Sequence, residues 1–186
     1  LFHKTMKDID VPALRYDYIN VSINGDSIGI MAIEEHFSKE LLEHQHRKEN
    51  VIFKASEEYY WEYLLHKNQY KAAERAKGLK PWPRKKLDVA RRAFTNGLNV
   101  PFEVYGSGKV NKSESLSKQR QIGAGLLRSM VHGDLKPSDI FDVDNVGAFA
   151  AGLWLWESHH PTNLVNARMY LNPYTLKFEM VAFDAN

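Results

Sequence analysis

The sequence predicts an α+β fold, with strands first, helices in the middle and a β-hairpin at the end. Three observations predict this class. Two alternating runs lie on either side of Asn24-Gly25 near the start of the chain. Residues 57–157 hold most of the segments with helical spacing, and two further strand-like runs flank the turn residues at 172–175. Separation of strands from helices along a chain is typical of α+β proteins.

Length and composition indicate a packed globular domain. The chain has 186 residues, of which 44% are hydrophobic and 12% aromatic. Its net charge of +2 does not indicate a nucleic-acid partner, and we expect none. The absence of cysteine excludes disulfides, thiolate catalysis and cysteine-ligated zinc. No apolar run reaches the ~18 residues that a membrane-spanning helix needs. The sequence starts at Leu1 and not at a methionine, so we expect it to be a piece of a longer protein.

The first elements are a hairpin and a helix. Residues 16–23 alternate between apolar and polar, and 28–33 follow after the turn signal Asn24-Gly25, so we expect a β-hairpin. Residues 37–45 have helical spacing, with Ser38 placed as an N-cap.

A short apolar run at 51–54 then predicts a third strand. Residues 78–86 are basic and contain prolines, which favours a connection, and the region around Gly106 and Gly108 is typical of a loop. Helical spacing predicts the remaining helices at 57–77, 88–95, 116–130 and 146–156.

The last element is a hairpin whose open end carries two polar side chains. Residues 168–171 and 176–183 are expected to be strands joined by a turn at 172–175. Asn166 enters the first strand and Asp184 leaves the second, so pairing of the strands brings both to the same end. An amide oxygen and a carboxylate held together suit a hard cation such as Mg²⁺. A surface hairpin with solvated ends is the alternative.

The N-terminal hairpin has a possible nucleotide role. A β-turn-β unit with Asn24-Gly25 and Gly29, followed by a strand that carries Lys54, is how kinase-like proteins cover and bind ATP phosphates. Glycine permits close approach of the backbone, and the lysine ammonium offsets phosphate charge. An ordinary tight hairpin and a solvated lysine explain the same residues.

The run from His132 to Asp139 is similar to the protein-kinase catalytic loop H-R-D-x-x-x-x-N, with Asp134 as its aspartate. Asp139 stands where that motif has asparagine, and no Asp-Phe-Gly follows. We therefore interpret the run as a connector, in which Pro137 and Ser138 form a turn and Asp144 is the N-cap of the next helix.

Taken together, the chain resembles the CotH family, the spore coat protein H kinases, an atypical branch of the protein-kinase-like fold. The resemblance spans most of the chain except about 57–110. The residues that carry it are Tyr18 to Gly25, Gly29 to Phe37, Val51 to Lys54, Asp139 to Val143, Asn166 to Tyr170 and Phe183-Asp184.

The resemblance implies a truncated kinase-like domain with a strand region at 1–56, a mainly helical region at 57–157 and a metal-site hairpin at 158–186, lacking the C-terminal lobe. It implies transfer of the ATP γ-phosphate to serine of partner proteins with Mg²⁺. Asn166 and Asp184 match the metal-binding asparagine and aspartate, and Lys54 matches the lysine that binds the phosphates. The glutamate partner of that lysine is left open among Glu34, Glu35 and Glu58.

The position of the catalytic base departs from the family. His160 is the residue nearest to the place of the family's catalytic aspartate, and no aspartate lies between Trp156 and Asn166. A neutral histidine can accept a proton, and Glu157 is a second candidate.

Two alternatives to a kinase follow from this departure. The first is a CotH-like scaffold or cell-surface binding module that has lost phosphotransfer. The second is a hydrolase with a metal bound by His159 and His160, which would need a third ligand. The family resemblance implies a location at the spore surface, in the cell envelope or outside the cell.

Overall fold

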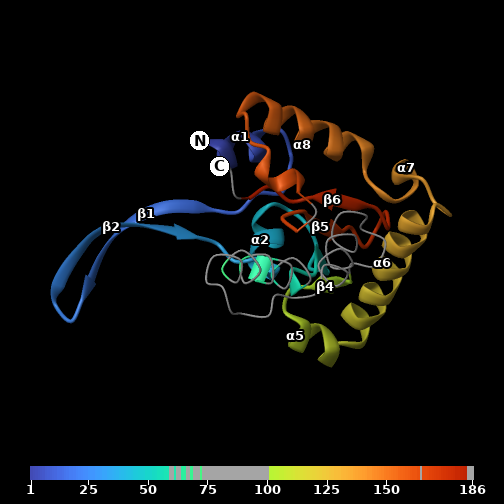
Figure 1. The fold of residues 1–186 in the computed structure, drawn as a ribbon, viewed down its shortest axis with the longest axis horizontal. Helices are drawn as coiled ribbons and strands as arrows, with labels where there is room; N and C mark the ends of the chain where they lie inside the picture. The colour runs from blue at the N-terminus through green and yellow to red at the C-terminus, as the bar shows by residue number, and fades with distance from the viewer. Residues whose placement is uncertain are drawn as a thin grey trace.

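A computed structural model describes residues 1–58, 101–163 and 165–183, together with positions 61, 64, 65, 68 and 72. It contains helices and two antiparallel sheets, so the predicted α+β class is confirmed. Figure 1 shows a body in which helices surround a four-stranded sheet, and a two-stranded arm that extends away from it. None of the helices in the described part of the chain is long and apolar enough to cross a membrane.

The arm is the predicted N-terminal hairpin. Strands β1 (Tyr16–Ile23) and β2 (Asp26–Glu34) are antiparallel and are joined by Asn24 and Gly25. These two residues have φ values of 53° and 93°, as a two-residue hairpin turn requires. The strands run side by side out to the tip in Figure 1, with a bulge at Val21 and Ser22.

The second sheet has four antiparallel strands in the order β4-β3-β5-β6. The strands predicted at 51–54 and 168–171 are confirmed, each within a residue. The last predicted strand begins later than expected, because Leu176 has a φ of 55°, which a strand cannot accommodate, and it ends at Met180 instead of residue 183. The bounds are Phe102–Val104 for β4, Ile52–Ala55 for β3, Arg168–Leu171 for β5 and Phe178–Met180 for β6.

One face of this sheet packs on helix α6 (Glu114–His132), which confirms the helix predicted at 116–130. Gly123 of α6 lies so close to the sheet that an added Cβ would be 2.6 Å from the Phe53 ring. Leu127 is fully buried at the same contact. The cluster on this face contains Val51, Phe53, Val104, Val110, Leu127, Ile140, Met169, Leu171 and Phe178.

The opposite face packs on helix α2 (Lys39–His44), within the predicted helix at 37–45. Leu41 and Leu42 of α2 are buried against Ile52 and Tyr170 of the sheet. Ser38 is the N-cap residue as predicted, although its hydroxyl donates to Glu40 instead of accepting from the backbone. A third cluster joins helix α1 (Phe2–Asp8) to helix α8 (Val143–Leu155).

Three expectations about connections are wrong. Pro137 and Ser138 do not form a turn but begin the short helix α7 (Pro137–Ile140), because proline is favoured in the first turn of a helix. The region around Gly106 and Gly108 is not a loop, because β4 and helix α5 (Ser107–Lys112) occupy it; both elements are too short to produce a clear period in the sequence. Asp144 is not the N-cap of α8. The helix starts at Val143, earlier than predicted, and the Asp142 carboxylate accepts from Asn145 N at 3.0 Å.

Other predicted segments are described in part or not at all. The described positions between 58 and 72 are helical, in agreement with the start of the helix predicted at 57–77. The connection at 78–86 and the helix at 88–95 lie outside the described residues.

Candidate functional site

Strand pairing brings Lys54 to the loop that carries Asn166. Lys54 on β3 lies directly opposite Arg168 on β5, and Asn166 precedes Arg168 by two residues. Two residues predicted to act together, far apart in the sequence, therefore lie at one end of the sheet. Asp184 lies outside the described residues, and Phe183 is the last residue that the structure describes.

Three charged side chains form a row across the sheet at this end. Because residues directly opposite each other in antiparallel strands point to the same face, Glu103, Lys54 and Arg168 share one face of β4, β3 and β5. The Lys54 ammonium is 3.6 Å from a Glu103 carboxylate oxygen and 5.6 Å from the centroid of the Tyr105 ring. We call Glu103, Lys54 and Arg168 the polar row.

Glu103 is the carboxylate that Lys54 contacts, and it was not among the three glutamates considered from sequence. Glu35 instead binds Arg15 through its carboxylate, at 2.5 Å and 3.0 Å. Glu58 is exposed at the start of the helical segment. Glu103 falls in the region of the sequence interpreted as loop-like, where no periodicity indicated a strand.

Arg168 is the buried member of the polar row, with 5% of its surface exposed. Its Nε donates to the Tyr105 hydroxyl at 2.5 Å, and an Nη is 3.5 Å from a Glu57 carboxylate oxygen. Its guanidinium also lies near three aromatic rings, which compensate for lost hydration through their negative faces. The ring centroids are at 4.6 Å for Phe183 and 5.6 Å for Phe37 and Tyr105.

The same guanidinium fixes the loop around Asn166. Nη1 of Arg168 donates to the carbonyls of Val165 at 2.6 Å and Ala167 at 3.3 Å, the residues on either side of Asn166. The Asn166 amide nitrogen donates to the carbonyl of His160 at 3.3 Å. The amide oxygen Oδ1 is thus the atom of this side chain that suits a cation.

His160 begins the 3₁₀ helix η1 (His160–Thr162), and its side chain is exposed. The hydrogen bond from Asn166 joins the predicted base and the predicted metal ligand within one loop. Glu157, the second candidate base, is exposed and has a φ of 51°.

Tyr105 is a residue of this site that the sequence did not indicate. Burial raises the pKa of the Tyr105 phenol, and nearby Arg168 opposes that rise. The phenol therefore stays protonated at neutral pH and accepts the hydrogen bond from Arg168. Its position becomes evident only from the pairing of β3 and β4, which places Tyr105 opposite Ile52.

A cavity of about 1240 Å³ lies at the root of the arm. Helix α1 contributes His3, Lys4 and Lys7 to its wall, and the start of β1 contributes Tyr16 and Tyr18. Phe183 also lines it, so this cavity and the Arg168 site share one aromatic side chain.

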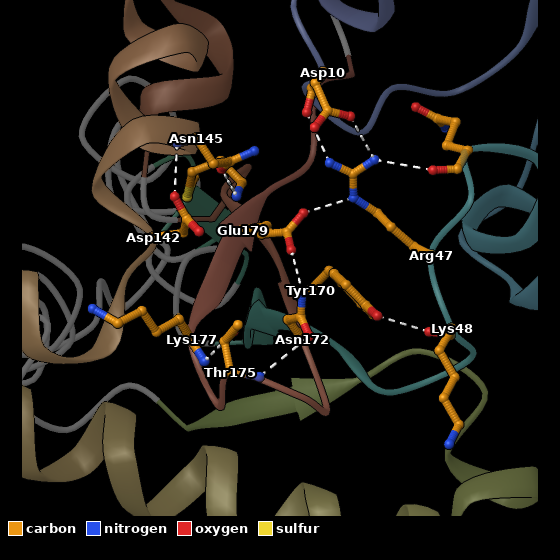
Figure 2. Close-up of polar contacts among 12 residues, drawn as sticks. Asp10, Arg47, Lys48, Asp142, Asn145, Tyr170, Asn172, Thr175, Lys177 and Glu179 are labelled. Atoms are coloured by element: carbon orange, nitrogen blue, oxygen red, sulfur yellow. Dashed lines mark hydrogen bonds and ion pairs between the residues drawn. The ribbon is translucent and has the colours of Figure 1, made fainter.

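A second charged network is structural. Figure 2 shows Arg47 between Glu179 and Asp10. Its Nε donates to Glu179 at 2.6 Å, and both side chains are largely buried. Its Nη atoms donate to the Asp10 carboxylate at 3.1 Å and the Asp10 carbonyl at 2.8 Å, while Asn172 donates to the other Glu179 oxygen at 2.8 Å. The network joins β6, the turn before it and the segment after α1.

The kinase-like run at 132–139 lies at the other end of the sheet. Phe141, just after it, bridges to Phe178 at the turn end of the β5–β6 hairpin, and Lys177 donates to the Ser138 carbonyl at 3.1 Å. Arg168 is at the open end of the same hairpin. Asp134 is exposed, and the Ser138 end of this run lies at the opposite end of the hairpin from Arg168, which pairs with Lys54.

Comparison with known proteins finds no protein-family model and no curated protein that matches this chain. Among residues 1–58, 101–163 and 165–183, no three histidine or carboxylate side chains are placed to hold a metal ion together. Within this part of the chain, the hydrolase alternative based on His159 and His160 therefore gains no third ligand.

Proposed function

We propose that the chain is part of a CotH-like protein kinase that transfers the γ-phosphate of ATP to serine of partner proteins with Mg²⁺. The observation that carries the proposal is the pairing of β3 with β5, which places Lys54 beside the Asn166 loop. A lysine next to a metal-binding amide is what positioning and charge neutralisation of a triphosphate require.

The side chains at this end of the sheet fit the two cofactors. Lys54 would bind ATP phosphates, and its contact with Glu103 holds the ammonium in place. Asn166 and Asp184 would hold Mg²⁺, and their amide and carboxylate oxygens suit a hard cation. When bound, ATP supplies the phosphoryl group and Mg²⁺ neutralises its charge.

Arg168 supports the pairing of Asn166 with Asp184. Its guanidinium binds the carbonyls on both sides of Asn166 and packs on Phe183, which directly precedes Asp184 in the chain. Each proposed metal ligand is therefore adjacent in sequence to a group that Arg168 holds. His160 would accept the proton of the serine hydroxyl, as a histidine base does.

A non-catalytic scaffold of the same fold is the second candidate. One feature favours it: His160 stands where the resemblance places the catalytic aspartate, and a neutral histidine lacks the negative charge that orients a hydroxyl. The contacts of Lys54 with Glu103 and of Asn166 with the His160 backbone fit either candidate. A protein that has lost phosphotransfer can keep such contacts for stability alone. It would serve as a binding module, and His160→Asp would restore or raise transfer only if the rest of the site were intact.

Calorimetric titration with ATP tests the proposal. We expect the full-length protein, of which this chain is part, to bind ATP more tightly with Mg²⁺ than with a chelator. Asp184→Ala should remove that difference, and Lys54→Met should weaken binding in both conditions because the phosphate contact is lost. Lys112→Met, which changes an exposed lysine on α5, is the matched control and should leave binding unchanged.

The outcomes separate the two candidates. Absence of ATP binding by the folded full-length protein would remove the kinase proposal. Because we expect the chain without its C-terminal lobe to be inactive, transfer is measured on the full-length protein. Mg²⁺-dependent ATP binding by that protein without phosphate incorporation into serine proteins would favour the scaffold. Binding that responds to Mg²⁺ equally in the wild type and in Asp184→Ala would show that Asp184 is not a metal ligand.

A further inference from the structure

The arm formed by β1 and β2 exposes an unusual amount of apolar surface. Every residue from 16 to 34 is exposed except Val21 and Gly29, which are half-buried. Figure 1 shows that the arm extends away from the body. Its exposed large apolar side chains are Tyr16, Tyr18, Ile19, Ile23, Ile28, Ile30, Met31 and Ile33, with Ile30 at 72% and Tyr18 at 66% exposure.

These side chains lie on both faces of the arm. The register pairs Ile19 with Met31 on one face, and Ile33 lies on that face as well. Tyr18 and Ile30 lie on the other face, since opposite residues share a face and neighbours along a strand alternate. Scattered single apolar residues need no explanation, but a continuous apolar surface of this kind marks an interaction site.

A two-stranded hairpin is also marginally stable by itself. The arm's root is held by the stacking of His3 on Tyr16, with ring centroids 5.5 Å apart, and by the Arg15–Glu35 ion pair. Beyond the root, its two open strand edges offer backbone groups to a further strand. A partner strand would therefore satisfy one edge, and its own side chains would pack beside the apolar side chains of that strand on both faces.

The charge of the arm indicates which partner fits. Residues 16–34 contain three carboxylates, Asp17, Asp26 and Glu34, and none of the chain's 25 lysines and arginines. Asp17 and Glu34 lie at the root and Asp26 at the tip, so the apolar strip is bounded by acidic residues at both ends. A complementary surface is apolar with basic residues at its ends.

We propose that the arm, residues 16–34, is a docking surface for a partner protein segment that combines apolar side chains with lysine or arginine and adds to the arm as a strand. A second copy of the arm fits less well, because antiparallel stacking of two arms would bring Asp26 of one close to Asp17 and Glu34 of the other. This surface does not depend on phosphate transfer, so it stands or falls separately from the proposed kinase activity.

Fluorescence anisotropy with two labelled peptides tests this inference. One peptide, as long as β1, has valine and threonine in its middle and lysines at both ends, and the other has glutamates in place of the lysines. We expect the lysine peptide to bind and the glutamate peptide not to bind. Met31→Asp should weaken binding of the lysine peptide by about tenfold or more, and the double variant Asp17→Lys, Asp26→Lys should exchange the preference between the two peptides.

Trp154→Asp is the matched control, because Trp154 on α8 is 81% exposed and lies outside the arm. It should leave the anisotropy titration unchanged. The inference is overturned if folded chain does not bind the lysine peptide, or if Met31→Asp and Trp154→Asp have equal effects. Sedimentation velocity that shows a dimer lost in Met31→Asp would assign the surface to a second copy and would also overturn it.

Discussion

The guanidinium of Arg168 lies 4.6 Å from the centroid of the Phe183 ring, in the interior of the protein. This contact joins the residue that starts β5 to a residue just past the end of β6. Because Arg168 also binds the carbonyls of Val165 and Ala167, one side chain fixes both strand ends at the proposed metal site. Arg168 is thus a positioning residue in this proposal.

Replacing Arg168 with methionine should lower the free energy of unfolding by about 3 kcal/mol, since a buried charge network with several hydrogen bonds is lost. Arg168→Lys keeps the charge but not the planar fork that reaches both carbonyls. Its free energy of unfolding should therefore fall by about half as much as that of Arg168→Met. Urea unfolding measures both. Arg128→Met on the exposed face of α6 is the control and should change stability by less than about 0.5 kcal/mol.

Breaking the Arg47–Glu179 ion pair should lower the free energy of unfolding by a similar amount to Arg168→Met. Among the described residues, Glu179→Gln leaves the buried Arg47 guanidinium with the Asp10 carboxylate as its remaining counter-charge, and the free energy of unfolding should fall by about 3 kcal/mol. The exposed pair Lys39–Glu43 on α2 provides the comparison. Glu43→Gln should cost less than about 0.5 kcal/mol, as surface pairs do. Equal losses in the two variants would contradict a structural role for the buried pair.

The sequence predicted those parts of the fold that have strong local signals. Asn24-Gly25 fixed the arm through the turn geometry that this dipeptide favours, and α6 was evident from its long helical period. β4 was missed because it has three residues with a glutamate at the centre. The start of α8 was misplaced because Asp142 and Asp144 are both suitable N-caps, and only the backbone decides between them.

The candidate site was predictable residue by residue but not as an arrangement. Sequence reasoning singled out Lys54 and Asn166, yet their proximity follows from the β3–β5 pairing, which no local pattern specifies. Glu103 and Tyr105 were missed for the same reason, since both reach the site through β4. Strand order in a sheet is set by the packing of both faces, and that information is distributed over the whole chain.

Two glycines of α6 should respond to alanine in opposite directions. At Gly123 an added Cβ would lie 2.6 Å from the Phe53 ring and 3.2 Å from Leu171, so Gly123→Ala should lower the free energy of unfolding by about 1–3 kcal/mol. At Gly125 nothing lies within 4 Å of the added atom, and Gly125→Ala should raise it by about 0.5–1 kcal/mol through helix propensity. Chemical denaturation of both variants tests the close packing of α6 on β3; stabilisation by both would contradict it.

His3 should make the protein less stable in mild acid. Burial lowers the pKa of its imidazole below 6.5, and the neighbouring Lys7 ammonium lowers it further. Its Nε2 is buried and has no hydrogen-bond partner among the residues that the structure describes, so protonation would bury a charged donor. As the pH falls through about 6.5, the unfolded chain takes up this proton before the folded chain does, and stability decreases until the folded pKa is passed.

Melting temperatures between pH 7.5 and 5 should fall in the wild type and in the exposed control His132→Gln, and the fall should be smaller in His3→Gln. An equal fall in all three proteins would show that His3 does not contribute.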